Sequence, residues 1–164
     1  MKKLWLVRHA KSSWSNLSLP DIDRPLNERG YRDAHEMPDR VFKNKEPGIP
    51  ELLISSSAIR ALSTALIFAR KFGYNEAGIR IEPELYETSV ASYLNIVRHV
   101  PEHLESVMLF GHNPIMTDFL NLLTNAGIEN IPTTGVACIS WNGSWSAIGE
   151  GCSLVLYEFP KKTA

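Results

Sequence analysis

The sequence of 164 residues is poor in cysteine, in net charge and in long apolar runs, and each shortage excludes a class of protein. Its two cysteines, Cys138 and Cys152, form no C-x-x-C motif, which favours two small buried side chains over a disulfide framework or a zinc site. The net charge of −1 provides no general positive field for nucleic acid or an acidic membrane. The apolar run in MKKLWLVRHA is too short for a signal peptide, and no other stretch could span a membrane. We therefore expect a cytoplasmic protein with no nucleic-acid or membrane partner.

The chain has the size of one domain, and its 44% of hydrophobic residues suffices for a buried core. No repeat, low-complexity stretch or linker divides it, so we expect a single domain over residues 1–164. Segments with strand and helix patterns alternate, which is typical of a mostly parallel sheet covered on both faces. We predict a three-layer αβα sandwich with an antiparallel addition at the C-terminal end.

Apolar periodicity and turn residues give approximate bounds for each element. Strands are expected at residues 3–8, 51–57, 106–111, 135–143 and 152–159, with a shorter one within 79–85. Helices are expected at residues 28–42, 58–73, 90–100 and 114–127, with a turn at 44–50. Asn27 should cap the first helix, and Pro38 should kink or restart it. Gly73 should end the second helix, and Gly127 should follow the end of the fourth.

Polar residues follow three of the expected strands at the point where each strand ends. Arg8 and His9 follow the first strand, Arg60 begins the helix after the second, and His112 follows the strand at 106–111. The carboxyl ends of parallel strands lie at one edge of a sheet, where ligands bind in α/β proteins. We therefore expect two arginines and two histidines, distant in sequence, to meet in one site.

Two arginines and two histidines suit the transfer of a phosphoryl group. Arginine binds phosphate oxygens bidentately and keeps its charge at any working pH, and the helix starts near Arg60 and Pro114 add N–H groups that attract an anion. One histidine can attack phosphorus and form a phosphohistidine, while the second binds the transferring group. Fixed cationic donors would then stabilise the transition state in place of a metal ion, so we expect no metal and no cofactor.

Other phosphate chemistry does not fit the sequence. There is no P-loop pattern, and neither cysteine has the downstream arginine that a cysteine-based phosphatase needs. Asp21 and Asp23 form a D-x-D pair, but no core strand precedes them as an aspartyl-phosphate motif requires. His9 and His112 with a carboxylate could bind a metal ion, but the neighbouring arginines would repel it.

Three blocks of the sequence resemble the histidine phosphatase (phosphoglycerate mutase-like) superfamily. RHAKSSW is similar to its R-H-G-x-x-x-W signature, with Ala10 in place of glycine. SSSAIRALSTA is similar to its S-x-x-x-R-A-x-x-T-A block, and GHNP to its second-histidine block. Within the superfamily, DIDRPLNERG and LYETS look most like the SixA-like phosphohistidine phosphatases. The resemblance implies His9 as the nucleophile, with Arg8, Arg60 and His112 in the phosphate pocket.

The resemblance also implies roles for two further positions. Many members carry the general acid at the position of Glu87, where it would protonate the leaving group. A phosphoramidate nitrogen is basic, so Glu87 could be dispensable for such a substrate. Mutase-like members often have an asparagine ligand seven residues after the first arginine; here Ser15 takes that position, with Asn16 beside it.

The expected function is a metal-independent phosphatase that acts through a phosphohistidine at His9. The short stretch between Glu87 and Gly111 has room for one helix and one strand but not for a lid. An open site favours a side chain displayed by a protein, so the expected substrate and partner is a phosphohistidine-bearing protein domain. Two alternatives stay open: a small-molecule phosphomonoesterase of the same superfamily and, from a different class, a phosphate-binding module without activity.

Overall fold

A computed structural model describes residues 1–43 and 48–161, so the turn expected at 44–50 lies partly outside the described residues. Within them, the strands form one sheet in the order β3-β2-β4-β1-β5-β6. The strands are β1 Lys2–Arg8, β2 Leu52–Ser55, β3 Arg80–Ile81, β4 Ser106–Gly111, β5 Val136–Trp141 and β6 Ser153–Glu158. The first four are parallel to one another, whereas β5 is antiparallel to β1, and β6 to β5. The mostly parallel sheet with an antiparallel C-terminal addition is confirmed.

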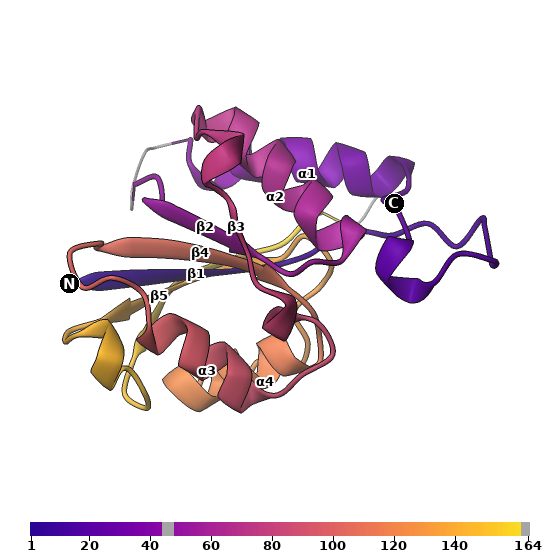
Figure 1. Cartoon of the computed structure of the whole chain (residues 1–164). Helices are drawn as coiled ribbons and strands as arrows, with labels where there is room; N and C mark the ends of the chain where they lie inside the picture. The colour runs from indigo at the N-terminus through magenta and orange to yellow at the C-terminus, as the bar shows by residue number, and fades with distance from the viewer. Residues whose placement is uncertain (44–47, 162–164) are drawn as a thin grey trace.

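Helices cover both faces of the sheet (Figure 1). The pair α1 Glu28–Val41 and α2 Ile59–Phe72 lies on one face, and the pair α3 Val90–Arg98 and α4 Ile115–Thr124 lies on the other. Single-turn 3-10 segments in the connections are η1 Asp21–Asp23, η2 Glu76–Gly78, η3 Pro83–Leu85 and η4 Trp145–Ala147. The predicted three-layer αβα architecture is therefore confirmed.

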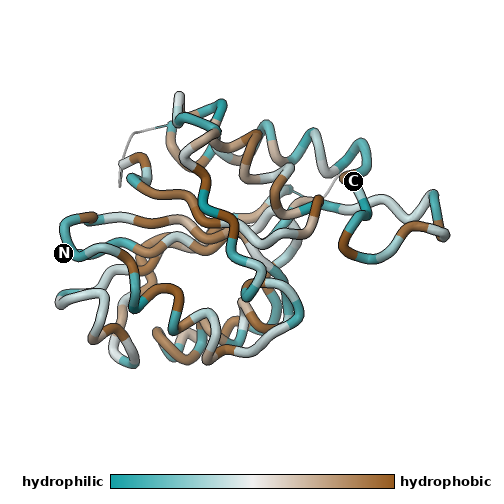
Figure 2. The backbone as a smooth tube through the Cα atoms, viewed as in Figure 1, coloured by the Kyte–Doolittle hydropathy of each residue, from teal (hydrophilic) through white to brown (hydrophobic). Residues whose placement is uncertain are grey.

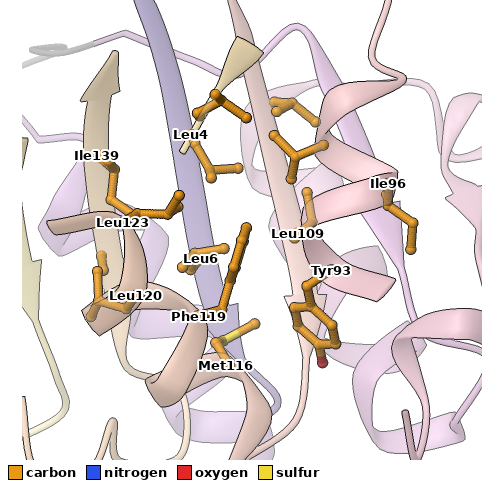
Figure 3. Packing of buried hydrophobic residues seen from close by; sticks show 14 of the residues in the cluster. Leu4, Leu6, Tyr93, Ile96, Leu109, Met116, Phe119, Leu120, Leu123 and Ile139 are labelled. Atoms are coloured by element: carbon orange, nitrogen blue, oxygen red, sulfur yellow. The ribbon is translucent and has the colours of Figure 1, made fainter. Parts of the chain in front are cut away.

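Strand β1 lies in the interior of the sheet and is buried on both faces. Leu4 and Leu6 pack in the cluster under α3 and α4 (Figure 3), whereas Trp5 and Val7 pack with Phe68 and other residues under α1 and α2. Because side chains alternate between the faces of a strand, a strand covered on both sides is apolar at every position. This explains the unbroken apolar run before Arg8 and the hydrophobic centre of the sheet in Figure 2.

The structure refines two helix details. Helix α1 continues through Pro38 to Val41 and does not restart there, because a proline in the last turns of a helix removes one hydrogen bond only a few residues before the helix ends. Helix α4 ends at Thr124 and Gly127 follows this end as expected, but the residue directly after the helix is Asn125, which has a φ of 55°. Asparagine tolerates this left-handed conformation better than most residues other than glycine, so it can end the helix here.

The other predicted helix signals are confirmed. Asn27 caps α1 by accepting the amide hydrogen of Gly30, and Gly73 ends α2 with a φ of 71°. Both cysteines, Cys138 and Cys152, are free and buried as expected, and burial raises the pKa of Cys138 to about 12.

Among residues 1–43 and 48–161, none of the helices has the length and apolar character needed to cross a bilayer.

Candidate active site

A cavity of about 440 Å³ lies at the carboxyl ends of β1 and β4. Arg8 and His9 from the end of β1, Arg60 from the first turn of α2 and His112 from the residue after β4 all line it. In Figure 1 these strand ends lie on the right, on the side where the segment between β1 and α1 projects from the body of the molecule. The parallel arrangement of β1, β2 and β4 thus brings together the four side chains that the sequence analysis selected.

Backbone contacts hold the ends of β1 and β4 together beside the cavity. The amide of His9 donates to the carbonyl of Gly111 at 3.1 Å. The hydroxyl of Tyr93, on α3, accepts the amide hydrogen of His112 at 3.0 Å. It lies so close to Gly111 that a Cβ there would overlap it. A glycine before His112 therefore allows α3 to position the second histidine.

His9 is buried, and one of its two ring nitrogens has no hydrogen-bond partner among the described residues. Its Nδ1–H donates to the carbonyl of Ala10 at 2.7 Å, so the lone pair lies on Nε2. Burial lowers the pKa of His9 to about 3, aided by His112, Arg60 and Arg8 and opposed by the bond to Ala10. At neutral pH the ring is therefore uncharged, and the lone pair of Nε2 is available to an electrophile.

His112 lies beside His9, with 5.1 Å between the ring centroids. Its Nε2 is 2.8 Å from Ser56 Oγ, while its Nδ1 is buried without a hydrogen-bond partner among the described residues. Burial and then the charge of Arg60 lower the pKa of His112 to about 4, although the charge of Asp21 acts the other way. This neutral ring would offer a phosphoryl group a hydrogen bond.

Arg8 and Arg60 supply positive charge to the cavity. One guanidinium nitrogen of Arg8 donates to the carbonyl of Ile131 at 2.8 Å, and one of Arg60 donates to the carbonyl of Asp21 at 2.7 Å. The Nε of each arginine is buried and has no partner in the part of the chain that the structure describes. Both arginines line the cavity, and guanidinium groups bind phosphate oxygens bidentately, so the cavity is suited to an anion.

Asp21, in η1, is the main site residue that the sequence analysis did not select. Its Oδ2 accepts hydrogen bonds from Arg60 at 2.9 Å and from the Tyr86 hydroxyl at 2.7 Å, and its Oδ1 accepts two from Arg24, at 2.9 and 3.1 Å. The hydrogen bond from Tyr86, followed by those from the arginines, holds the pKa of Asp21 well below its usual range. Because both carboxylate oxygens are occupied, Asp21 orients Arg60 and is not free to attack phosphorus.

Arg24 joins η1 to the segment that follows β1. It donates to Ser12 Oγ at 2.7 Å, and its guanidinium lies 3.6 Å from the ring centroid of Trp14. Trp14 lines the cavity and is 61% exposed, so it belongs to the rim of the site. For Arg24, Ser12 and Trp14, the only sequence signal was the resemblance of RHAKSSW and DIDRPLNERG to the superfamily. Loops have no apolar periodicity that could predict such contacts.

The two remaining predicted site residues, Ser15 and Glu87, have different positions. Ser15 does not line the cavity: it is exposed, and its hydroxyl lies 2.9 Å from Ser13 Oγ. Asn16 is also outside the lining and accepts hydrogen bonds from the amide and hydroxyl of Ser18. These local turn contacts leave the predicted phosphate contact of Ser15 without geometric support. Glu87 does line the cavity and is exposed, with a φ of 49°.

Comparison with known sequences identifies the family. The model of the histidine phosphatase superfamily (branch 1) matches residues 4–105. An uncharacterised chloroplastic protein of Arabidopsis thaliana is 30% identical over 163 residues, which cover 92% of this chain and 73% of that protein. An uncharacterised protein of Mycobacterium tuberculosis is 26% identical over 166 residues, covering 94% of this chain and 100% of that protein.

Solved structures agree with this assignment. The crystal structure of a candidate phosphohistidine phosphatase SixA from Agrobacterium tumefaciens is similar with a TM-score of 0.81 and 29% identity, covering 98% of this chain and 99% of that one. The protein histidine phosphatase SixA complexed with tungstate has a TM-score of 0.80 at 17% identity and 96% coverage of each chain. A mycobacterial glucosyl-3-phosphoglycerate phosphatase, with a TM-score of 0.72 at 15% identity and coverage of 98% and 100%, shares the phosphoglycerate mutase-like fold. The chain therefore belongs to the histidine phosphatase superfamily and is SixA-like within it.

Proposed function

We propose that this phosphatase of the histidine phosphatase type acts on phosphohistidine in proteins and uses His9 as its nucleophile. The observation that carries the proposal is a neutral His9 whose Nε2 keeps its lone pair, in one cavity with the side chains of Arg8, Arg60 and His112. A phosphoryl group bound among these three side chains would present its phosphorus to the nucleophile.

The proposed reaction has two steps. The lone pair of His9 Nε2 first attacks phosphorus, and the bond from phosphorus to the substrate imidazole breaks. The electron pair of that bond stays on the leaving nitrogen, which takes up a proton. Water then attacks the phosphorus of phosphorylated His9, the Nε2 leaves with its electron pair, and phosphate is released. Arg8, Arg60 and His112 donate hydrogen bonds to the phosphoryl oxygens in both steps, where the charge of the transition state lies.

Apart from Glu87, whose role depends on the leaving group, the acids in the cavity favour a phosphoramidate as the substrate. The Asp21 carboxylate is ionised, and burial together with the hydrogen bond to Asp21 raises the pKa of Tyr86 to about 12. Neither group gives up a proton readily at neutral pH. The nitrogen of a phosphoramidate is basic and takes a proton from solvent or substrate, so it depends less on such an acid than an alkoxide does.

The shape of the site favours a substrate displayed on a protein. Between Glu87 and Gly111, a stretch that is fully described, the chain forms α3 and β4 and has no inserted segment that could cover the cavity. Trp14 and Glu87 lie at the cavity with exposed side chains. A histidine that projects from another protein could enter without a closing movement of this one.

The proposal is tested with a protein whose histidine has been phosphorylated by potassium phosphoramidate. Phosphate release is measured in excess EDTA for the wild type, His9→Ala and, as a control at an exposed position of α1, His35→Ala. We expect wild-type turnover with an acid-labile phosphoenzyme, an unchanged control, and a loss of about 1,000-fold or more in His9→Ala. Turnover of an alkyl phosphate but not of phosphohistidine would indicate a phosphomonoesterase, and phosphate binding without any turnover would indicate a binding module.

A further inference from the structure

The two ring nitrogens of His112 have different surroundings, and the difference begins at Ser56. Ser56 follows β2, is fully buried and does not line the cavity. Its Oγ lies 2.8 Å from His112 Nε2 and accepts the amide hydrogen of Ala58 at 3.1 Å. His112 Nδ1, in contrast, is buried and has no partner among the described residues.

The hydrogen atoms of this group can be assigned from the donors and acceptors. The amide of Ala58 can only donate, so it uses a lone pair of Ser56 Oγ and leaves the hydroxyl hydrogen available. His112 Nε2 is the acceptor within reach of that hydrogen. A neutral imidazole carries one hydrogen, and if Nε2 accepts from Ser56 that hydrogen must lie on Nδ1.

The opposite tautomer leaves two groups unsatisfied. If His112 Nε2–H donated to Ser56 Oγ, the hydroxyl hydrogen would have no acceptor in the part of the chain that the structure describes. His112 Nδ1 would then carry a lone pair in place of a hydrogen, and this buried atom has no hydrogen-bond partner among the described residues. Buried polar groups in folded proteins are nearly always paired, so this arrangement is disfavoured.

We infer that Ser56 is a positioning residue that keeps the hydrogen of His112 on Nδ1 and so makes this histidine a hydrogen-bond donor to the phosphoryl group. Ser56 affects the reaction only through its contact with His112. The donation by His112 to a phosphoryl group rests on the proposed function, whereas the tautomer of His112 is a property of the folded chain alone.

His9 shows the complementary arrangement in the same cavity. Its Nδ1–H is used by the carbonyl of Ala10 at 2.7 Å, so its lone pair lies on Nε2. Two neutral histidines with ring centroids 5.1 Å apart thus receive different roles from one hydrogen bond each. His9 offers a lone pair to phosphorus, and His112 offers a hydrogen to the oxygens around it.

The tautomer is measured directly by nitrogen NMR of the ring of His112 in the folded wild type, with the signal assigned through His112→Gln. We expect hydrogen on Nδ1 at neutral pH. Hydrogen on Nε2 would overturn the inference, whatever the protein hydrolyses.

Ser56→Ala tests the cause, and Ser55→Ala is its matched control. Ser55 is equally buried, but its hydroxyl donates only to the backbone carbonyl of Ser56 at 2.9 Å. We expect Ser56→Ala to shift hydrogen from Nδ1 to Nε2 of His112 and to weaken the binding of inorganic phosphate by about tenfold, while Ser55→Ala changes neither. Equal tautomers and equal phosphate affinities in the two variants would contradict the role of Ser56.

The outcomes separate this inference from the proposed function. If the tautomer and the phosphate affinity follow Ser56 but phosphohistidine is not hydrolysed, the proposed substrate is wrong and the role of Ser56 stands. If Ser56→Ala does not fold, the tautomer of His112 in the wild type still decides the question.

Discussion

His9 and His112 are uncharged at neutral pH because they are buried beside two arginines, and this makes the folded state sensitive to acid. Histidine in an unfolded chain takes up a proton near pH 6.5, whereas the folded chain resists until the pKa values of about 3 for His9 and about 4 for His112. Between about pH 6.5 and pH 4 the unfolded state therefore binds more protons. The free energy of unfolding must rise with pH in this window and fall as acid is added.

We expect His9→Asn to lose part of this acid sensitivity. When the pH falls from about 7 to about 4.5, the buried and uncharged His9 should lower the free energy of unfolding of the wild type by about 2 kcal/mol. The variant lacks this contribution. Urea unfolding at both pH values measures the difference, and the slope with pH is the readout because the substitution also changes packing. His35→Asn, at an exposed position of α1, should keep the wild-type slope. A shared slope in all three proteins would contradict a buried, neutral His9.

Glu87 differs from the other candidate acids because it is exposed at the cavity, and its role depends on the leaving group. If it is a general acid, Glu87→Gln should lower kcat/KM for an alkyl phosphate by about 100-fold or more, because an alkoxide leaves poorly without a proton. The same variant should lose less than about threefold with a phosphorylated imidazole. Steady-state kinetics with both substrates measure the contrast, with Glu84→Gln as an exposed control outside the cavity lining. Equal losses with both substrates would show that Glu87 does not act as an acid.

Among the elements, η1 is only three residues long, yet Asp21 joins it to two others. Its carboxylate accepts hydrogen bonds from Arg60 on α2 and from Tyr86 directly after η3. We expect Asp21→Asn to lower kcat/KM by about tenfold or more, because Arg60 loses a charge-assisted partner that fixes its orientation. The inhibition constant of inorganic phosphate measures the accompanying loss of phosphate binding. Asp23→Asn, an exposed carboxylate in the same segment, is the control; equal effects of the two substitutions would mean that only the charge of η1 matters.

The whole molecule depends on a sheet whose two faces are both covered, with β4 in the middle of its parallel part. Leu109 on β4 is fully buried in the cluster under α3 and α4 (Figure 3). We expect Leu109→Ala to lower the free energy of unfolding by about 3 kcal/mol, because the cavity left behind cannot collapse between a sheet and two helices. Urea unfolding measures the loss, with Leu122→Ala, 38% exposed on α4, as the control. A loss no larger than that of the control would mean that this face of the sheet is loosely packed.

The sequence alone determined the layers and the four central side chains of the site. Strands buried on both faces require unbroken apolar runs, and helices require a periodic apolar face. Both patterns can be recognised within a short stretch of the sequence. Since parallel strands end at one edge, the positions of Arg8, His9, Arg60 and His112 after strands or at a helix start sufficed to bring them together.

The tertiary structure decided what surrounds those four side chains. Asp21 accepts hydrogen bonds from Arg60 and Tyr86 across the fold, the hydroxyl of Ser56 lies beside His112, and Ser15 lies outside the cavity lining. The end of α4 at Asn125 likewise depends on one residue that adopts a left-handed conformation. Such contacts leave no periodic trace in the sequence, because each depends on the position of one atom in space, whereas burial of an apolar face repeats along the chain.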